Sequence, residues 1–118
     1  LLKGDIKDTL PQALAQLGRL DYAFIDGNHR LQPTLDYFEA CLAYSHDSTV
    51  LVVDDIYWSE EMKTAWETIK NHPKVTLSID LLAMGLVFFR KEQHHRQHFT
   101  LIPTRYKPWK MGFFAPNP

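Results

Sequence analysis

The chain has 118 residues, 45% of them hydrophobic and 23% charged, which is a composition typical of one small globular domain. The formal net charge of −1 at pH 7 argues against binding to nucleic acid or to an anionic membrane surface. No apolar run approaches the roughly 20 residues of a membrane-spanning helix. The single cysteine, Cys41, excludes an internal disulfide, which favours a cytoplasmic location, and we interpret it as a buried apolar residue.

The first third of the sequence predicts a helix and a buried strand. Residues 1–6 are typical of the exit of a strand and a turn. Pro11 suits the first position of a helix, because a proline there loses no hydrogen bond, and Gly18 suits its end. Tyr22–Ile25 form a short, unbroken apolar run, which is typical of a strand buried on both faces of a parallel sheet.

A second strand of the same kind follows at residues 50–53. The segment 32–44 is long enough for a crossover helix between the two strands, and Pro33 suits its start. We therefore predict a βαβ unit with parallel strands. A third helix should follow Ser59, which is a good N-cap, and its buried face should be formed by Met62, Ala65, Trp66 and Ile69.

Residues 75–79 alternate apolar and polar side chains, which is typical of a half-exposed strand, and residues 86–89 are apolar again. The few residues between them are too short for a crossover helix, so this pair should form an antiparallel hairpin. Residues 99–102 predict an additional edge strand. The expected organisation is one domain over residues 1–102, followed by an extended tail rich in proline and aromatic residues at 103–118.

Acidic residues follow both predicted buried strands, with Asp26 after the first and Asp54 and Asp55 after the second. The carboxyl ends of parallel strands share one edge of a sheet, where ligands bind in open α/β folds. The three carboxylates suit a Mg²⁺ site, and His29, in the same loop as Asp26, suits a general base. The alternative is that these acids cap helices or bind loop amides.

Tyr57 and Trp58 come directly after the acid pair. Both suit the apolar lining of a pocket for a small-molecule substrate, while Trp58 could instead pack over the start of the third helix. The sequence contains no Gly-x-Gly-x-x-Gly phosphate-binding loop and no Gly-x-Ser-x-Gly nucleophile motif.

Three segments together resemble the C-terminal half of class I S-adenosylmethionine-dependent methyltransferases, and in particular small bacterial O-methyltransferase-like proteins. These segments are Gly4-Asp5, residues 21–29 and residues 50–59. The hairpin at 75–90 is similar to the final antiparallel strand pair of that family. The resemblance implies an α/β fold with a three-layer Rossmann-like sheet, truncated, in which parallel strands are followed by a C-terminal antiparallel β-hairpin.

The resemblance also implies S-adenosylmethionine as cofactor and a role for each matching residue. Asp5 falls near the adenine, and Asp26 falls beside the methyl donor, where some members also bind Mg²⁺. Asp54 and Asp55 fall where those members carry further metal ligands. His29 falls where they carry a catalytic lysine, which makes it the candidate base.

The Gly-rich loop and the ribose-binding acid of that family are missing from these 118 residues. We therefore expect an incomplete, inactive fragment of a parent protein that methylates an oxygen or nitrogen of a small molecule. In the family, the strand equivalent to Tyr22–Ile25 pairs with the missing first strand, so here it should be an exposed edge through which the chain forms a homo-oligomer.

Two alternatives stay open at this point. The first is a non-catalytic α/β assembly or binding module that uses no cofactor. The second is a metal-dependent hydrolase whose site is built on Asp26, Asp54 and Asp55.

Overall fold

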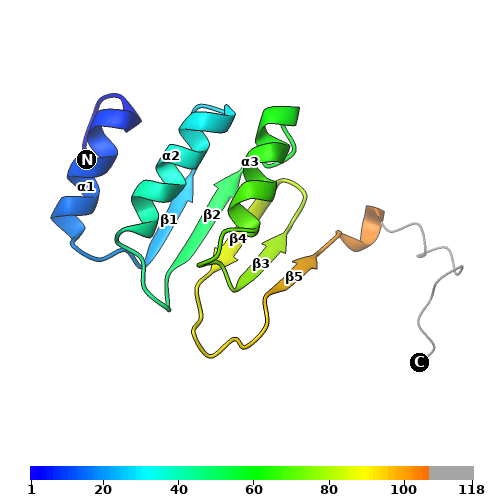
Figure 1. The fold of residues 1–118 in the computed structure, drawn as a ribbon. Helices are drawn as coiled ribbons and strands as arrows, with labels where there is room; N and C mark the ends of the chain where they lie inside the picture. The colour runs from blue at the N-terminus through cyan, green and yellow to red at the C-terminus, as the bar shows by residue number, and fades with distance from the viewer. Residues whose placement is uncertain (107–118) are drawn as a thin grey trace, which may run out of the picture.

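The structure is a computed structural model, and residues 1–106 are described here. Three helices pack on one face of a five-stranded sheet (Figure 1). The helices are α1 (Ile6–Leu17), α2 (Leu31–Leu42) and α3 (Glu60–Lys70), and a short 3₁₀ helix covers Thr104–Tyr106. The strands are β1 (Tyr22–Ile25), β2 (Val50–Asp54), β3 (Leu77–Asp80), β4 (Met84–Phe88) and β5 (Gln97–Thr100). No helix within residues 1–106 is both long and apolar enough to cross a membrane.

The strand order is β1-β2-β4-β3-β5. The β1 and β2 strands are parallel, and β4 runs antiparallel to both β2 and β3, which confirms the predicted βαβ unit and hairpin. The edge strand expected at 99–102 is present as β5, two residues earlier, and it is parallel to β3. Most of the expected tail, residues 107–118, lies outside the described residues.

The first helix begins earlier than the sequence predicts. Asp5 is its N-cap, and its side chain accepts a hydrogen bond from the backbone N–H of Lys7 at 3.0 Å. Pro11 therefore lies inside α1 rather than at its first position, and no strand forms in the described residues before it. Such a cap satisfies a free N–H at the helix start, whereas Pro11 leaves one backbone hydrogen bond of the helix unmade. Gly18 ends the helix in the left-handed conformation, as predicted.

The other two helices match their predicted faces more closely. The α2 helix begins at Leu31, two residues before Pro33. Ser59 caps α3 by accepting a hydrogen bond from the N–H of Met62 at 3.2 Å. The buried residues of α3 are those predicted: Met62, Ala65, Trp66 and Ile69.

The core lies between the helices and one face of the sheet. Cys41 on α2 is buried in it, and burial raises the pKa of its thiol to about 11, which confirms its interpretation as an apolar core residue. Trp66 on α3 is 1% exposed and covers Gly85 on β4. A Cβ atom at Gly85 would lie 2.4 Å from a ring carbon of Trp66, so only glycine leaves room for this indole.

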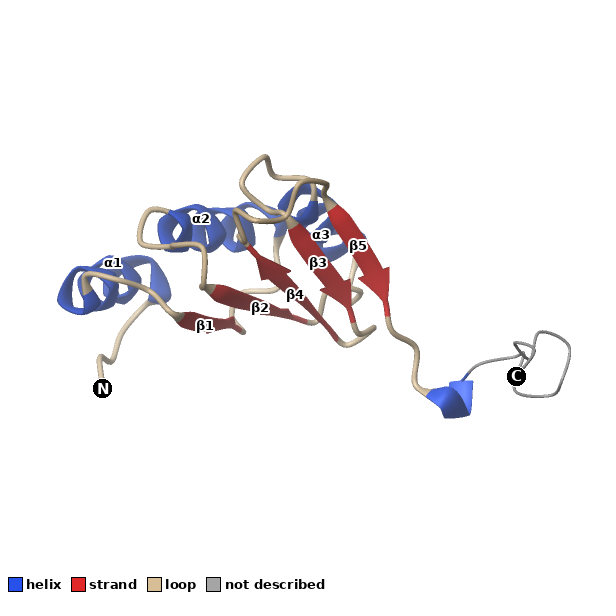
Figure 2. Cartoon of the chain, turned by 90° about the horizontal axis from the view of Figure 1, so that it is seen from below, coloured by secondary structure: helices blue, strands red, loops and turns tan. Residues whose placement is uncertain are grey.

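The opposite face of the sheet carries no helix among the described residues (Figure 2). The strand register places two rows of mostly apolar side chains on this open face. The rows are Tyr22, Val50, Phe88, Leu77 and Gln97, and Phe24, Val52, Leu86, Ile79 and Phe99. The unbroken apolar run of β1 suggested a strand buried on both faces. This prediction is wrong, because one face of β1 is open. Tyr22 is 60% exposed and Phe24 46% exposed on an edge strand.

Substitution of Gly85 by alanine should destabilise the fold, because the added methyl group overlaps the Trp66 ring in a packed core. We expect a loss of about 1–3 kcal/mol in the free energy of unfolding, measured by urea denaturation. Ser48→Ala in an exposed loop is the control and should change this free energy by less than about 0.5 kcal/mol. Equal stability of Gly85→Ala and the control would contradict the packing described here.

Candidate functional site

Three of the predicted site residues meet at one edge of the sheet. Asp26 follows β1 directly, Asp55 follows β2 directly, and His29 lies between β1 and α2. His29 Nε2 is 3.0 Å from Asp55 Oδ2 and 3.6 Å from Asp26 Oδ1. One ligand atom from each residue lies within 4.8 Å of the others. We refer to Asp26, His29 and Asp55 as the edge cluster.

The ring nitrogen of His29 is the most informative atom of the edge cluster. Nε2 is covered from solvent and makes no hydrogen bond of acceptable geometry, although two carboxylates lie close to it. Nε2 thus lies between two anionic groups in a position that solvent does not reach. The donor set of one imidazole and two carboxylates therefore fits a divalent cation.

The backbone around the cluster is held in an uncommon conformation. Asn28 and Asp55 have φ angles of 44° and 52°, in the left-handed region. Asparagine and aspartate tolerate this region better than most other residues, but it is still uncommon for any residue except glycine. Strained residues of this kind are found at functional sites when the surrounding structure holds them. Here the turn at Asp55 directs its carboxylate toward His29.

Two other predicted residues take different places. Asp54 is the last residue of β2 and is not part of the edge cluster, so the structure joins His29 to two of the three predicted metal ligands. Asp5 caps α1, as described above. It also lines a cleft of about 310 Å³ between the starts of α1 and α2, together with Asn28 and Tyr37.

Tyr57 and Trp58 lie in the loop between β2 and α3. Trp58 is 69% exposed, so it does not pack beneath the start of α3; its ring centroid lies 5.4 Å from that of His29. The hydroxyl of Tyr57 donates a hydrogen bond to Asp80, a buried residue that sequence reasoning missed. The sequence signal for Asp80 was an acidic residue at a position of strand 77–80 where the alternation places a buried side chain.

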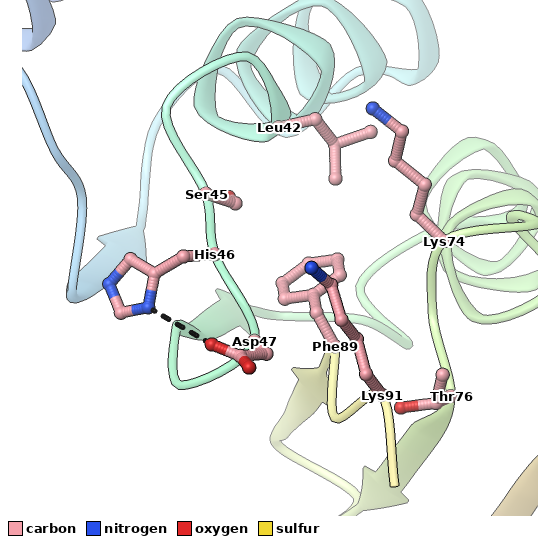
Figure 3. A pocket seen from close by; sticks show the side chains of 8 residues that line it. All are labelled: Leu42, Ser45, His46, Asp47, Lys74, Thr76, Phe89 and Lys91. Carbon is pink, nitrogen blue, oxygen red and sulfur yellow. Dashed lines mark ion pairs between the residues drawn. The ribbon is translucent and has the colours of Figure 1, made fainter. Parts of the chain in front are cut away.

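A larger cleft, of about 460 Å³, lies away from the edge cluster (Figure 3). Its walls come from the loop before β2 and from the segments flanking β3 and β4. The side chains that face it are Leu42, Ser45, His46, Asp47, Lys74, Thr76, Phe89 and Lys91. The loop before β2 is at the opposite end of that strand from Asp55, so this cleft is separate from the predicted ligand-binding edge.

Comparisons with known proteins agree with the fold. Residues 1–56 match the family model of a methyltransferase domain. A search of curated proteins gave no match. Among solved structures, the chain is similar to the apo structure of CalS11, a TDP-rhamnose 3'-O-methyltransferase of calicheamicin biosynthesis. The TM-score is 0.58 and the sequence identity 21%, over 75% of this chain and 40% of that chain. The similarity at this identity supports the methyltransferase-like Rossmann fold.

The Tyr57–Asp80 hydrogen bond gives a measurable titration. Together with burial, it raises the pKa of Tyr57 from 10.0 to about 12, because the neutral phenol is the form that donates to the carboxylate. The resulting contribution to stability is fully present below pH 10 and is lost as the pH rises through about 12. Absorbance titration of tyrosinate in the wild type and in Tyr57→Phe should differ by one step near pH 12. If Tyr57→Phe instead lost a titration step near pH 10, Tyr57 would have an ordinary pKa, which would contradict this assignment.

Proposed function

We propose that this chain, which has a class I methyltransferase-like fold, takes part in methyl transfer from S-adenosylmethionine to an oxygen or nitrogen of a small molecule. Residues 1–56 match a methyltransferase domain, and methyltransferases usually take S-adenosylmethionine as cofactor, which supports this choice of methyl donor. The edge cluster carries the proposal, since it places a histidine and two carboxylates at the edge of the sheet where ligands bind. The activity of the protein in the similar solved structure, an O-methyltransferase, favours oxygen as the acceptor.

In this proposal His29 accepts the proton that the substrate nucleophile loses. The carboxylates of Asp26 and Asp55, within 3.6 Å of its Nε2, compensate the charge that the imidazole then carries. Asp26 would also lie beside the methyl donor, as the resemblance to methyltransferases implies. The exposed ring of Trp58 next to His29 provides an apolar wall for the substrate. Catalysis would rest chiefly on holding the nucleophile and the methyl group in line.

The cleft beside Asp5 and Asn28 is our proposed site for the nucleoside end of the cofactor. Its volume of about 310 Å³ and its lining, which includes Ile6, Pro11 and Tyr37, suit a flat aromatic base. The sequence offers no Gly-rich loop for the amino acid end of the cofactor. We therefore propose that the chain binds S-adenosylmethionine weakly and is inactive on its own.

A divalent cation at the edge cluster is a second proposal, supported by the convergence of His29 Nε2 and the two carboxylates at one point. Imidazole nitrogen favours a transition metal such as Mn²⁺ or Zn²⁺ over the Mg²⁺ expected from three carboxylates. A bound cation would ease deprotonation of a substrate hydroxyl.

The first test is an NMR titration of the 118-residue chain with S-adenosylhomocysteine. We expect weak binding, with a Kd on the order of 1 mM, which corresponds to about −4 kcal/mol. Signals of residues 4–6 and 26–29 should shift, while those of Lys74 and Lys91 in the other cleft should not. Shifts confined to the other cleft, or none at millimolar ligand, would contradict the proposed cofactor site.

The same spectra, recorded with Mn²⁺, test the cation proposal by relaxation enhancement. His29→Ala and Asp26→Asn should each reduce the affinity for Mn²⁺ by at least about tenfold. Asp54→Asn is the matched control, since it removes a neighbouring carboxylate outside the edge cluster. Equal losses in all three variants would point to diffuse attraction of the cation and against a defined site.

We also propose a homo-oligomer formed through the edge of β1. Its unpaired backbone groups, with Tyr22 and Phe24 exposed beside them, form an edge suited to pairing with a second copy. Sedimentation velocity should therefore show association that increases with concentration, and Phe24→Lys should reduce it. A wild-type chain that stays monomeric at high concentration would overturn this proposal.

A further inference from the structure

Asp80 is an acid in an unusual place. It is the last residue of β3 and is 1% exposed, and none of the ion pairs within residues 1–106 includes it. Its Oδ1 accepts a hydrogen bond from the N–H of Leu82 at 2.9 Å, and its Oδ2 accepts one from the hydroxyl of Tyr57. Burying a carboxylate costs free energy unless hydrogen bonds compensate it, so both bonds stabilise Asp80 in its buried position.

Tyr57, one of the two hydrogen-bond partners of Asp80, lies in the loop that contributes Asp55 to the edge cluster. Tyr57 is two residues after Asp55 and directly before Trp58. The N–H of Trp58 donates to the carbonyl oxygen of Asp55 at 3.0 Å, which makes residues 55–58 one tight turn. Within this turn, the Asp55 carboxylate and the Trp58 ring both lie against His29.

The conformation of this turn depends on contacts that hold its residues in place. Asp55 has a φ of 52°, and a non-glycine residue in that region persists only where its surroundings hold it. Ile56 is fully buried in the core and fixes the start of the turn, whereas Tyr57 and Trp58 are 45% and 69% exposed and depend on other contacts. The bond from Tyr57 to the buried Asp80 is the polar contact that ties this turn to the hairpin of β3 and β4.

We propose that Asp80 is a positioning residue for the edge cluster. Through Tyr57 it holds the turn at 55–58, so that Asp55 and Trp58 stay in contact with His29. This proposal rests on the function proposed for the cluster. It adds Asp80 to the site and gives Tyr57, which the sequence suggested as a pocket residue, a positioning role through its hydrogen bond to Asp80.

The experiment compares Tyr57→Phe, Asp80→Asn and Asp80→Ala in the 118-residue chain, with Tyr22→Phe on exposed β1 as the matched control. Two quantities are measured at one fixed pH: the affinity for Mn²⁺ and the chemical shift of the His29 ring protons, which report the nearby Trp58 ring. Tyr57→Phe and Asp80→Ala should weaken Mn²⁺ binding about 10-fold to 100-fold and move the His29 signals. Asp80→Asn should keep both quantities near wild type, because its amide can accept from Leu82 and donate to Tyr57.

The outcomes separate this proposal from the proposed function. If the wild type does not bind Mn²⁺, the cation site fails, and the His29 signals alone decide: moved signals in Tyr57→Phe support positioning, and unmoved signals overturn it. If the wild type binds Mn²⁺ and Tyr57→Phe matches it in both quantities, positioning is overturned. If Asp80→Ala does not fold, Tyr57→Phe still decides, because it removes a single hydroxyl group.

Discussion

The parallel pairing of β1 and β2 is the constraint on which the candidate site depends. Ile25 lies opposite Val53, so the residues that follow both strands emerge at the same edge of the sheet. These residues are acidic on both strands, and carboxylates gathered at one edge repel one another. The imidazole of His29 lies between Asp26 and Asp55, where a proton or a cation on its nitrogen would relieve that repulsion.

Much of the fold could be predicted because its signals are local. An apolar run at 22–25 and a second at 50–53 specify two strands, and the length of chain between them specifies a crossover. Ser59 and the apolar stripe after it specify α3 to within a residue. Pro11 misled the prediction of α1, because proline is common at helix starts whereas the cap at Asp5 is a weaker signal in sequence.

Burial and side-chain direction could not be predicted in the same way. An unbroken apolar run does not reveal whether a strand is central or at an edge, so the edge position of β1 was predicted only from the resemblance to methyltransferases, and its open face was not predicted. Which of Asp54 and Asp55 joins the edge cluster depends on the left-handed conformation of Asp55. The residue types at these positions do not predict that conformation. Asp54 alternates with Val52 and so belongs to the open face, whereas Asp55 lies beyond the strand and turns toward His29.

The residues that would carry the chemistry and the residues that hold them come from different parts of the chain. Asp26, His29 and Asp55 all lie within residues 1–56, the part matched by the methyltransferase family model. Tyr57 and Asp80 lie beyond it, and they meet only because β3 and β4 fold back beside β2. The family match therefore covers the candidate site residues, while the contacts that hold the loop after β2 in place come from the part of the chain beyond the match. The antiparallel hairpin thus does more than complete the sheet, since it provides the buried carboxylate to which the loop after β2 is tied.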